Sequence, residues 1–260
     1  MIRIAAVGDI HIGTDSAGVL RQQLERLPDQ ADLFLLAGDL TRVGDPAEAA
    51  ILADELASLR IPVVAVLGNH DYHGDAVAEI EAVLVRAGLT VLEGDAVTLD
   101  LGGTRVGIAA TKGFGGGFAG ATGSEFGEPE MKAFIRRTKA HAERLEQSLS
   151  GLEADIRIAL LHYAPIRDTL QGEPLELYPF LGSYLFGEAI DRAGADLVFH
   201  GHAHKGCEHG VTPGGIQVRN VAQPVLGHAY GLYCLNGDSE DVAVAAAASP
   251  TAMPSGRATP

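Results

Sequence analysis

The chain has 260 residues, 47% of them hydrophobic, and a formal charge of −15 at pH 7. The hydrophobic fraction is enough for a sizeable core in one large domain or two small ones. No apolar run approaches the ~20 residues of a membrane span. The negative charge and the lack of a clustered basic segment argue against a nucleic-acid polymer as partner.

The N-terminus and the cysteine content bear on the cellular compartment. Residues 2–7 have the pattern of a strand and lack the basic leader of a signal peptide. The two cysteines are too few for a disulfide framework, which agrees with a reducing compartment. We therefore expect a cytoplasmic protein without a membrane anchor.

The first third of the chain alternates strands with helices. Strands are predicted at residues 2–7, 33–37 and 62–67, and helices at 16–27, 45 to about 59, and 75–87. We expect Pro28 to end the first helix, Pro46 to begin the second and Gly88 to end the third. This alternation is typical of parallel βαβ units.

After residue 88 the pattern changes. Short strands at 91–92, 96–101 and 105–110 indicate an antiparallel or mixed sheet, and residues 112–127 form a glycine-rich loop. Further predictions are a long helix at 128–149, a strand at 156–161, a helix near 183–193, a strand at 196–199 and two or three strands to about 235. We expect one domain, residues 1–242, and a disordered tail, 243–260, rich in Ala, Ser, Pro and Gly.

Polar residues follow five of the predicted strands, in the segments Asp9-Ile10-His11, Gly38-Asp39, Gly68-Asn69-His70-Asp71, His162 and Gly201-His202-Ala203-His204. The first three segments recur every 30 residues, about the length of a βαβ unit, so each should return to the same sheet edge. Together the five segments supply two carboxylates, one amide oxygen and four imidazoles for metals, plus one spare histidine. This inventory suits two divalent metal ions about 3.5–4 Å apart.

Taken singly, the segments are weak to moderate evidence: Gly-Asp is ordinary turn chemistry and a lone histidine at a strand end is more often packed in the core, whereas Gly68-Asn69-His70-Asp71 is sharper and the His202/His204 pair is as consistent with a metal site as without one. Their order and content as a set resemble the calcineurin-like metallophosphoesterase superfamily, over residues 2 to about 236. The resemblance implies an α/β fold, a four-layer α/β/β/α sandwich of two mixed sheets flanked by helices. It also implies a hydrolase with two divalent transition-metal ions; the ligand types do not choose among Mn, Fe, Zn, Ni and Co.

The resemblance further implies a role for each polar residue: Asp9, His11 and His204 on one metal, Asn69, His162 and His202 on the other, and Asp39 bridging both. A hydroxide between the metals would attack phosphorus in line. His70 would contact the phosphoryl oxygens or protonate the leaving group.

One position departs from a branch of the superfamily. Arg42 stands where protein Ser/Thr phosphatases carry an acidic residue, three positions after the Gly-Asp aspartate. This argues against that branch and leaves open what orients His70, with the adjacent Asp71 as one candidate. The Gly-Asp-Leu-Thr and Gly-Asn-His-Asp segments are more similar to small bacterial phosphodiesterase-type members, which favours a small, nucleotide-derived phosphodiester as substrate.

Alternatives remain open. A phosphomonoesterase would use the same ligands, and a non-catalytic scaffold with this fold would be expected to lose some of them. His73, Lys112 and Arg167 are further candidates for substrate contacts, and Lys112 precedes glycines 113–117, whose backbone could approach a phosphate. A mobile loop with aromatic anchors explains that segment equally well. His200 could be buried or could support the neighbouring ligands, and the sequence does not indicate an oligomeric state.

Overall fold

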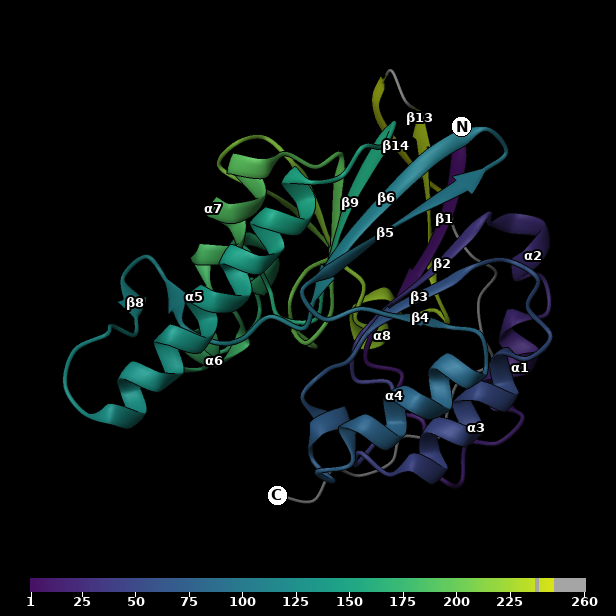
Figure 1. The fold of residues 1–260 in the computed structure, drawn as a ribbon, viewed down its shortest axis with the longest axis horizontal. Helices are drawn as coiled ribbons and strands as arrows, with labels where there is room; N and C mark the ends of the chain where they lie inside the picture. Colours follow the sequence, from purple (N-terminus) through teal and green to yellow (C-terminus); the bar gives the residue numbers. More distant parts are fainter. Residues whose placement is uncertain (237–238, 246–260) are drawn as a thin grey trace.

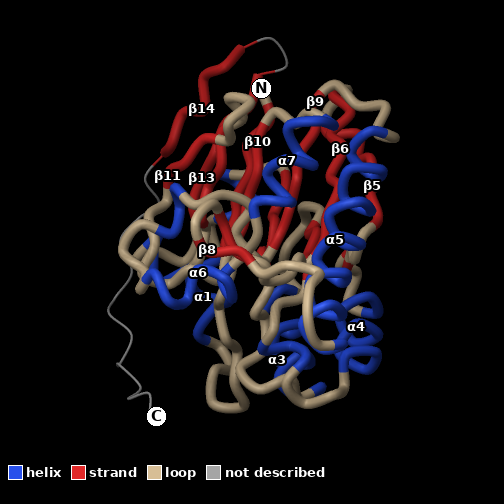
Figure 2. The backbone as a smooth tube through the Cα atoms, turned by 90° about the vertical axis from the view of Figure 1, so that its left-hand side faces the viewer, coloured by secondary structure: helices blue, strands red, loops and turns tan. Residues whose placement is uncertain are grey.

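Two six-stranded sheets lie face to face, with helices on both outer surfaces, in a computed structural model that describes residues 1–236 and 239–245 (Figures 1 and 2). The first sheet has the order β14-β13-β1-β2-β3-β4 and the second the order β11-β12-β10-β9-β6-β5. Each contains parallel and antiparallel pairs. The predicted α/β/β/α sandwich of two mixed sheets is confirmed.

The strands are short and mostly buried. The first sheet consists of β1 (Ile2–Val7), β2 (Leu33–Ala37), β3 (Val63–Val66), β4 (Thr90–Val91), β13 (Gly231–Asn236) and β14 (Ser239–Ala245). The second consists of β5 (Asp95–Leu101), β6 (Thr104–Thr111), β9 (Ile156–Leu161), β10 (Leu197–His200), β11 (His209–Val211) and β12 (Gln217–Asn220). A small hairpin, β7 (Gly117–Phe118) with β8 (Ala121–Thr122), lies outside both sheets.

Helices cover the outer face of each sheet. On the first sheet these are α1 (Val19–Leu24), α2 (Leu27–Gln30), α3 (Pro46–Leu56) and α4 (Val77–Arg86). On the second they are α5 (Pro129–Ser150) and α7 (Tyr184–Ala193). The connecting segments contain the short helices α6 (Tyr178–Leu181) and α8 (Gln223–Leu226) and the 3-10 turns η1 (His70–Tyr72), η2 (Asp168–Leu170) and η3 (Leu175–Leu177).

The core has three apolar layers, and the alternation of side chains along each strand explains them. Ile4 of β1 points between the sheets, where it packs in one cluster with residues of β2, β6 and β9. Its neighbour Ala5 points outward, into the cluster under α1 to α4. Because both faces of the central strands are buried, their sequences are continuous apolar runs.

The structure corrects the predicted helix at 16–27. Gly18 has a φ of +83°, a left-handed conformation that separates the preceding turn from α1, so the helix begins only at Val19. Pro28 does not end this helix. It lies in the first turn of a separate short helix, α2, where the missing backbone N–H of proline costs little.

Smaller differences concern three other segments. The second helix, α3, ends at Leu56 rather than near 59, and the glycine-rich loop contains the β7–β8 hairpin. β14 extends to Ala245, three residues into the predicted tail, because residues 243–245 pair with residues 232–234 of β13 through the backbone. Residues 246–260 lie outside the described residues, so the disordered tail stays a prediction.

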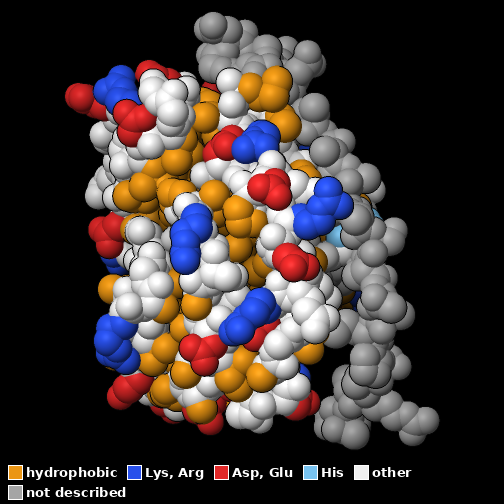
Figure 3. All heavy atoms as spheres, turned by 90° about the vertical axis from the view of Figure 1, so that its right-hand side faces the viewer, with side chains coloured by type: hydrophobic (Ala, Val, Ile, Leu, Met, Phe, Trp, Pro, Cys, Tyr) orange, Lys and Arg blue, Asp and Glu red, His pale blue; other side chains and the backbone are white. Residues whose placement is uncertain are grey.

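The helices and the surface of the described residues bear on the expected lack of membrane and nucleic-acid partners. No helix in this part of the chain is long and apolar enough to cross a membrane. On the face shown in Figure 3, lysine and arginine side chains lie among aspartates and glutamates and form no separate basic area. The expected cytoplasmic location and the exclusion of nucleic-acid polymers stay predictions.

Candidate metal centre

The five polar segments of the sequence meet at one end of the sandwich. In the first sheet β1, β2 and β3 are parallel neighbours, so their carboxyl ends deliver Asp9, Asp39 and Asn69 to the same edge. In the second sheet the parallel neighbours β9 and β10 deliver His162 and the segment 201–204. The loops of the two sheets therefore face each other across the end of the inter-sheet core.

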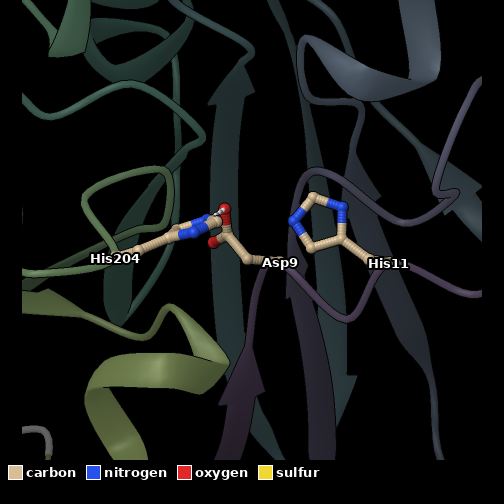
Figure 4. A group of neighbouring side chains, drawn as sticks. All are labelled: Asp9, His11 and His204. Atoms are coloured by element: carbon tan, nitrogen blue, oxygen red, sulfur yellow. Dashed lines mark hydrogen bonds and ion pairs between the residues drawn. The ribbon is translucent and has the colours of Figure 1, made fainter. Parts of the chain in front are cut away.

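The first group of possible metal ligands is Asp9, His11 and His204, with one ligand atom from each within 4.8 Å of the others. Figure 4 shows His11 and His204 on opposite sides of the Asp9 carboxylate. The Nε2 atom of His204 lies 2.8 Å from Asp9 Oδ1. The backbone N–H of His202 also donates to the Asp9 carboxylate, at 2.9 Å to Oδ2, which fixes the orientation of this carboxylate.

Asp39 belongs to two further groups: one with His11 and His70, the other with His162 and His202. Its Oδ1 lies 3.3 Å from His162 Nε2, and its Oδ2 lies 3.9 Å from both His11 Nε2 and His70 Nε2. The two oxygens of one buried carboxylate thus face different sets of imidazoles. This is the arrangement expected of a ligand shared between two metal ions.

Asn69 completes the second set of oxygen and nitrogen atoms. Its Oδ1 lies 2.9 Å from His162 Nε2, close to the carboxylate of Asp39. The structure therefore brings together all seven predicted metal ligands and His70, in agreement with the expectation that the strand ends converge.

Backbone strain is concentrated at this site. Among the described residues, five non-glycine residues have positive φ, and four of them are Asp9 (+58°), His11 (+43°), Asp39 (+50°) and His202 (+70°). Left-handed backbone costs of order 1–3 kcal/mol for a residue with a side chain and is found preferentially at functional sites. The strain turns each side chain away from its strand and toward the cleft.

Two glycines allow the close approach of these loops. A Cβ atom on Gly68 would collide with the Asp39 carboxylate and its backbone nitrogen. A Cβ on Gly201 would collide with Asp9 Oδ2 and with the carbonyl oxygen of Ala37. Only glycine fits at these positions, which explains the Gly residues that precede Asn69 and His202 in the sequence.

Carbonyl groups fix the tautomers of three histidines. His162 Nδ1 lies 2.9 Å from the Ala37 carbonyl and His70 Nδ1 lies 2.8 Å from the Arg42 carbonyl. A carbonyl can only accept, so both Nδ1 atoms donate and both Nε2 atoms face the cleft. His202 is reversed: its Nε2 donates to the Phe180 carbonyl at 3.3 Å and leaves Nδ1 for the site.

The structure corrects the suggestion that Asp71 orients His70. Asp71 is fully buried and its carboxylate accepts from the backbone N–H groups of Leu40, Thr41 and Gly68 and from the Thr41 hydroxyl. The group that orients His70 is the backbone carbonyl of Arg42. Asp71 instead joins the loop after β2 to the loop after β3, and adjacency in sequence concealed this role.

Burial sets the charge state of the candidate ligands. Burial lowers the pKa of His11 to about 4 and that of His202 to about 3, so both imidazoles are neutral at pH 7. Burial, with a smaller contribution from the neighbouring Asp39 charge, raises the pKa of Asp9 to about 6. The hydrogen bond between His204 and Asp9 raises the pKa of His204. His204 must therefore release a proton when it binds a metal ion.

These charges fit divalent cations. Asp9 and Asp39 are 2% and 1% exposed, and the nearby imidazoles of His11 and His202 are neutral at pH 7. Buried carboxylates without a compensating positive charge are costly, and nearby cations remove that cost. Carboxylate, amide and imidazole donors also suit first-row transition metals.

The further candidates from the sequence differ in burial and in their contacts. Lys112 is 3% exposed and lies beside the ligand loops. His73 is exposed, and its backbone N–H bonds the His70 carbonyl. Arg167 is exposed, with its guanidinium carbon 5.6 Å from the Tyr178 ring centroid. His200 is buried, and its ring nitrogens bond the Gly201 carbonyl and the Thr169 hydroxyl, so it supports the loop and belongs to none of the ligand groups.

Two residues next to the cleft were missed by sequence reasoning. Tyr72 lies on η1, two positions after His70, and Arg137 lies on α5, far away in sequence. The ring of Tyr72 contacts the ammonium of Lys112, and the guanidinium of Arg137 lies over Phe114, another ring beside Lys112. The position of Tyr72 beside the Gly-Asn-His-Asp segment was a usable signal, whereas nothing in the sequence of α5 marks Arg137.

The sequence matches a known protein family over most of its length. A model of the family described as calcineurin-like phosphoesterase matches residues 2–206. A Synechococcus protein named "Probable cyclic nucleotide phosphodiesterase" is 34% identical over 83 residues, 27% of this chain and 31% of that protein. The chain thus matches less than a third of the length of this relative.

Solved structures support the fold. The protein TT1561 of Thermus thermophilus is 18% identical, with a TM-score of 0.60 over 94% of this chain and 98% of that one. Another crystal structure is 14% identical, with a TM-score of 0.64 over 95% and 99% of the two chains. At these identities the likeness concerns the two-sheet architecture alone.

Proposed function

Because the chain belongs to the calcineurin-like phosphoesterase family, we propose that it is a metal-dependent hydrolase that cleaves a small phosphodiester with two divalent metal ions. The observation that carries the proposal is the position of Asp39, whose carboxylate belongs to two groups of possible ligands. The name of the Synechococcus relative supports a diester, and a nucleotide-derived one, over a monoester.

In this proposal Asp9, His11 and His204 would hold one metal ion, Asn69, His162 and His202 would hold the other, and Asp39 would contribute to both sites. Bound divalent ions would polarise the phosphoryl group and activate a water molecule for attack. Burial keeps His11 and His202 neutral, so each imidazole has a lone pair with which to bind a metal ion.

His70 is the proposed catalytic residue of the chain itself. Its Nδ1–H is held by the Arg42 carbonyl, so only Nε2 is available to the substrate. A proton delivered to the leaving oxygen would therefore come from Nε2 of the imidazolium form. The side chain of His70 is 44% exposed, which gives a substrate access to that atom.

The test compares hydrolysis of bis(p-nitrophenyl) phosphate with that of p-nitrophenyl phosphate by Mn²⁺-loaded protein, together with the metal content. The variant is Asp39→Asn and the matched control is Asp75→Asn, because both aspartates have positive φ (+50° and +54°) that asparagine tolerates. Asp75 is exposed and outside the ligand groups. The two variants therefore differ in the site and not in backbone strain.

We expect the wild type and Asp75→Asn to hold two metal ions per chain and to cleave the diester faster. Asp39→Asn should lose metal and activity together. An Asp39→Asn protein with full metal content and activity would refute the ligand assignment. A clear preference for the monoester would replace the phosphodiesterase proposal with the phosphomonoesterase alternative.

A further inference from the structure

Two positively charged side chains lie against aromatic rings beside the metal centre. The Nζ atom of Lys112 is 4.6 Å from the ring centroid of Tyr72, 5.2 Å from that of Phe114 and 5.3 Å from that of Tyr163. The guanidinium carbon of Arg137 is 4.9 Å from the same Phe114 centroid. We call these five residues the cation pocket.

The cation pocket adjoins the candidate ligands directly. Tyr163 follows His162 in sequence, and its ring centroid is 4.3 Å from that of His202. The carbonyl of Lys112 accepts from the backbone N–H groups of both His162 and Tyr163. One tyrosine ring thus separates the ammonium group of Lys112 from a proposed metal ligand.

The ammonium group of Lys112 is not bonded directly to a carboxylate, although the carboxylates of Glu93 and Asp39 attract it from a distance. The residue is 3% exposed, and within the described part of the chain its Nζ makes neither a hydrogen bond nor an ion pair. The nearby Glu93 is already engaged: Oε1 bonds Thr111 and pairs with His141, and Oε2 accepts from the backbone N–H of Lys112. Its carboxylate therefore holds the Lys112 backbone and does not bond the ammonium.

Arg137 adds a second positive charge to the same pocket. Arg137 itself is exposed, and it has no ion pair within residues 1–236 and 239–245. Two neighbouring cations repel each other, and a bound anion would stabilise both, so a concentration of positive charge beside a cleft favours anionic ligands.

We propose that the cation pocket binds a second anionic group of the substrate, a phosphate or carboxylate that lies a few bonds from the phosphoryl group under attack. Lys112 donates to this group from inside the pocket and Arg137 from its exposed rim. A nucleobase is the weaker occupant, because the two cations already lie over the rings on which it would stack. This substrate class deepens, and rests on, the proposed phosphoesterase function.

The test measures binding, so that it does not depend on turnover. Calorimetry with Mn²⁺-loaded protein compares phosphonocarboxylates having two to four methylene groups with alkylphosphonates of the same chain length. Neither class can be hydrolysed, and the paired ligands differ only in the terminal carboxylate. The variants are Lys112→Met and Arg137→Gln, and the matched control is Lys132→Met on α5, which lies outside the cation pocket.

We expect at least one phosphonocarboxylate to bind the wild type about tenfold more tightly than its partner, the effect of roughly one charge-assisted hydrogen bond. Lys112→Met and Arg137→Gln should each reduce this ratio, whereas Lys132→Met should keep it. Equal affinity within every pair in the wild type, or an unchanged ratio in both pocket variants, would overturn the proposal. Arg137→Gln, at an exposed position, keeps the test valid if Lys112→Met does not fold.

Hydrolysis of bis(p-nitrophenyl) phosphate by the same wild-type preparation separates the two proposals. Hydrolysis without a preference for the carboxylate ligands would remove the second-anion subsite and leave the phosphoesterase function intact. A clear preference without hydrolysis would keep the subsite and remove the proposed reaction.

Discussion

Replacement of Asp71 with asparagine should destabilise the loops that carry Asp39 and His70, although Asp71 touches neither imidazole nor substrate. Its carboxylate accepts from three backbone N–H groups, those of Leu40 (3.2 Å), Thr41 (2.7 Å) and Gly68 (2.7 Å). The Thr41 hydroxyl is the fourth donor, at 2.6 Å. Every partner is a donor, so the site requires two acceptor oxygens.

The magnitude follows from the two orientations open to the asparagine amide. If its NH₂ group faces Leu40 and Gly68, two buried backbone N–H groups lose their acceptor. If the amide is flipped, the Thr41 hydroxyl can rotate to accept, and one backbone N–H remains unpaired. The flipped orientation leaves only one buried donor unsatisfied and is therefore preferred, so we expect a loss of about 1–3 kcal/mol in the free energy of unfolding.

The assay is urea unfolding of the Asp71→Asn protein, with and without Mn²⁺, beside measurement of its metal content. The matched control is Asp45→Asn, because exposed Asp45 caps α3 with one hydrogen bond to the Ala47 N–H and asparagine caps a helix equally well. An unfolding free energy within about 0.5 kcal/mol of wild type, the usual scatter of neutral substitutions, would refute the reasoning.

The other predictions concern metal, loop packing and pH. Removal of metal with a chelator should abolish phosphoesterase activity, and Mn²⁺ should restore it, as a rate assay with elemental analysis can check. Gly201→Ala should reduce metal content, because the new Cβ would displace the Asp9 carboxylate; Gly151→Ala, with its nearest contact at 3.4 Å, should not. Burial raises the pKa of Glu93, but hydrogen bonds from His141 and Thr111 outweigh it and leave the pKa below its ordinary value. The ionised form therefore stabilises the fold above about pH 4.3, and the stability difference between wild type and Glu93→Gln should shrink as pH falls further.

The convergence of the ligands could be predicted from the sequence because it depends on topology. Parallel strands joined by helices bring their carboxyl ends to one edge, and the 30-residue repeat of Asp9, Asp39 and Asn69 fixes which edge. His162 and His202 followed from the same rule in the second sheet. The buried, continuously apolar strands made these positions easy to locate.

Other features of the site depend on contacts between distant segments and were not predictable. The carbonyl that orients His70 belongs to Arg42, and any residue there would supply it, so the side chain carries no signal. The aromatic surroundings of Lys112 require α5 to pack beside β6. The late start of α1 at Val19 depends on the left-handed backbone of Gly18, whereas the sequence pattern of residues 16–27 indicates one continuous helix.

Hydrogen bonds between the loops hold the strained backbone of the proposed ligands in place. Four of the proposed ligands have left-handed backbone, and this conformation persists only where other contacts determine it. Asp9 N–H donates to the Gly38 carbonyl and His11 N–H to the Asp39 carbonyl, so the loops after β1 and β2 hold each other. Asp71 then joins the second of these loops to the third. The ligand side chains are thereby fixed before any metal binds. A substitution that only cuts these links should therefore weaken metal binding without removing a single ligand atom.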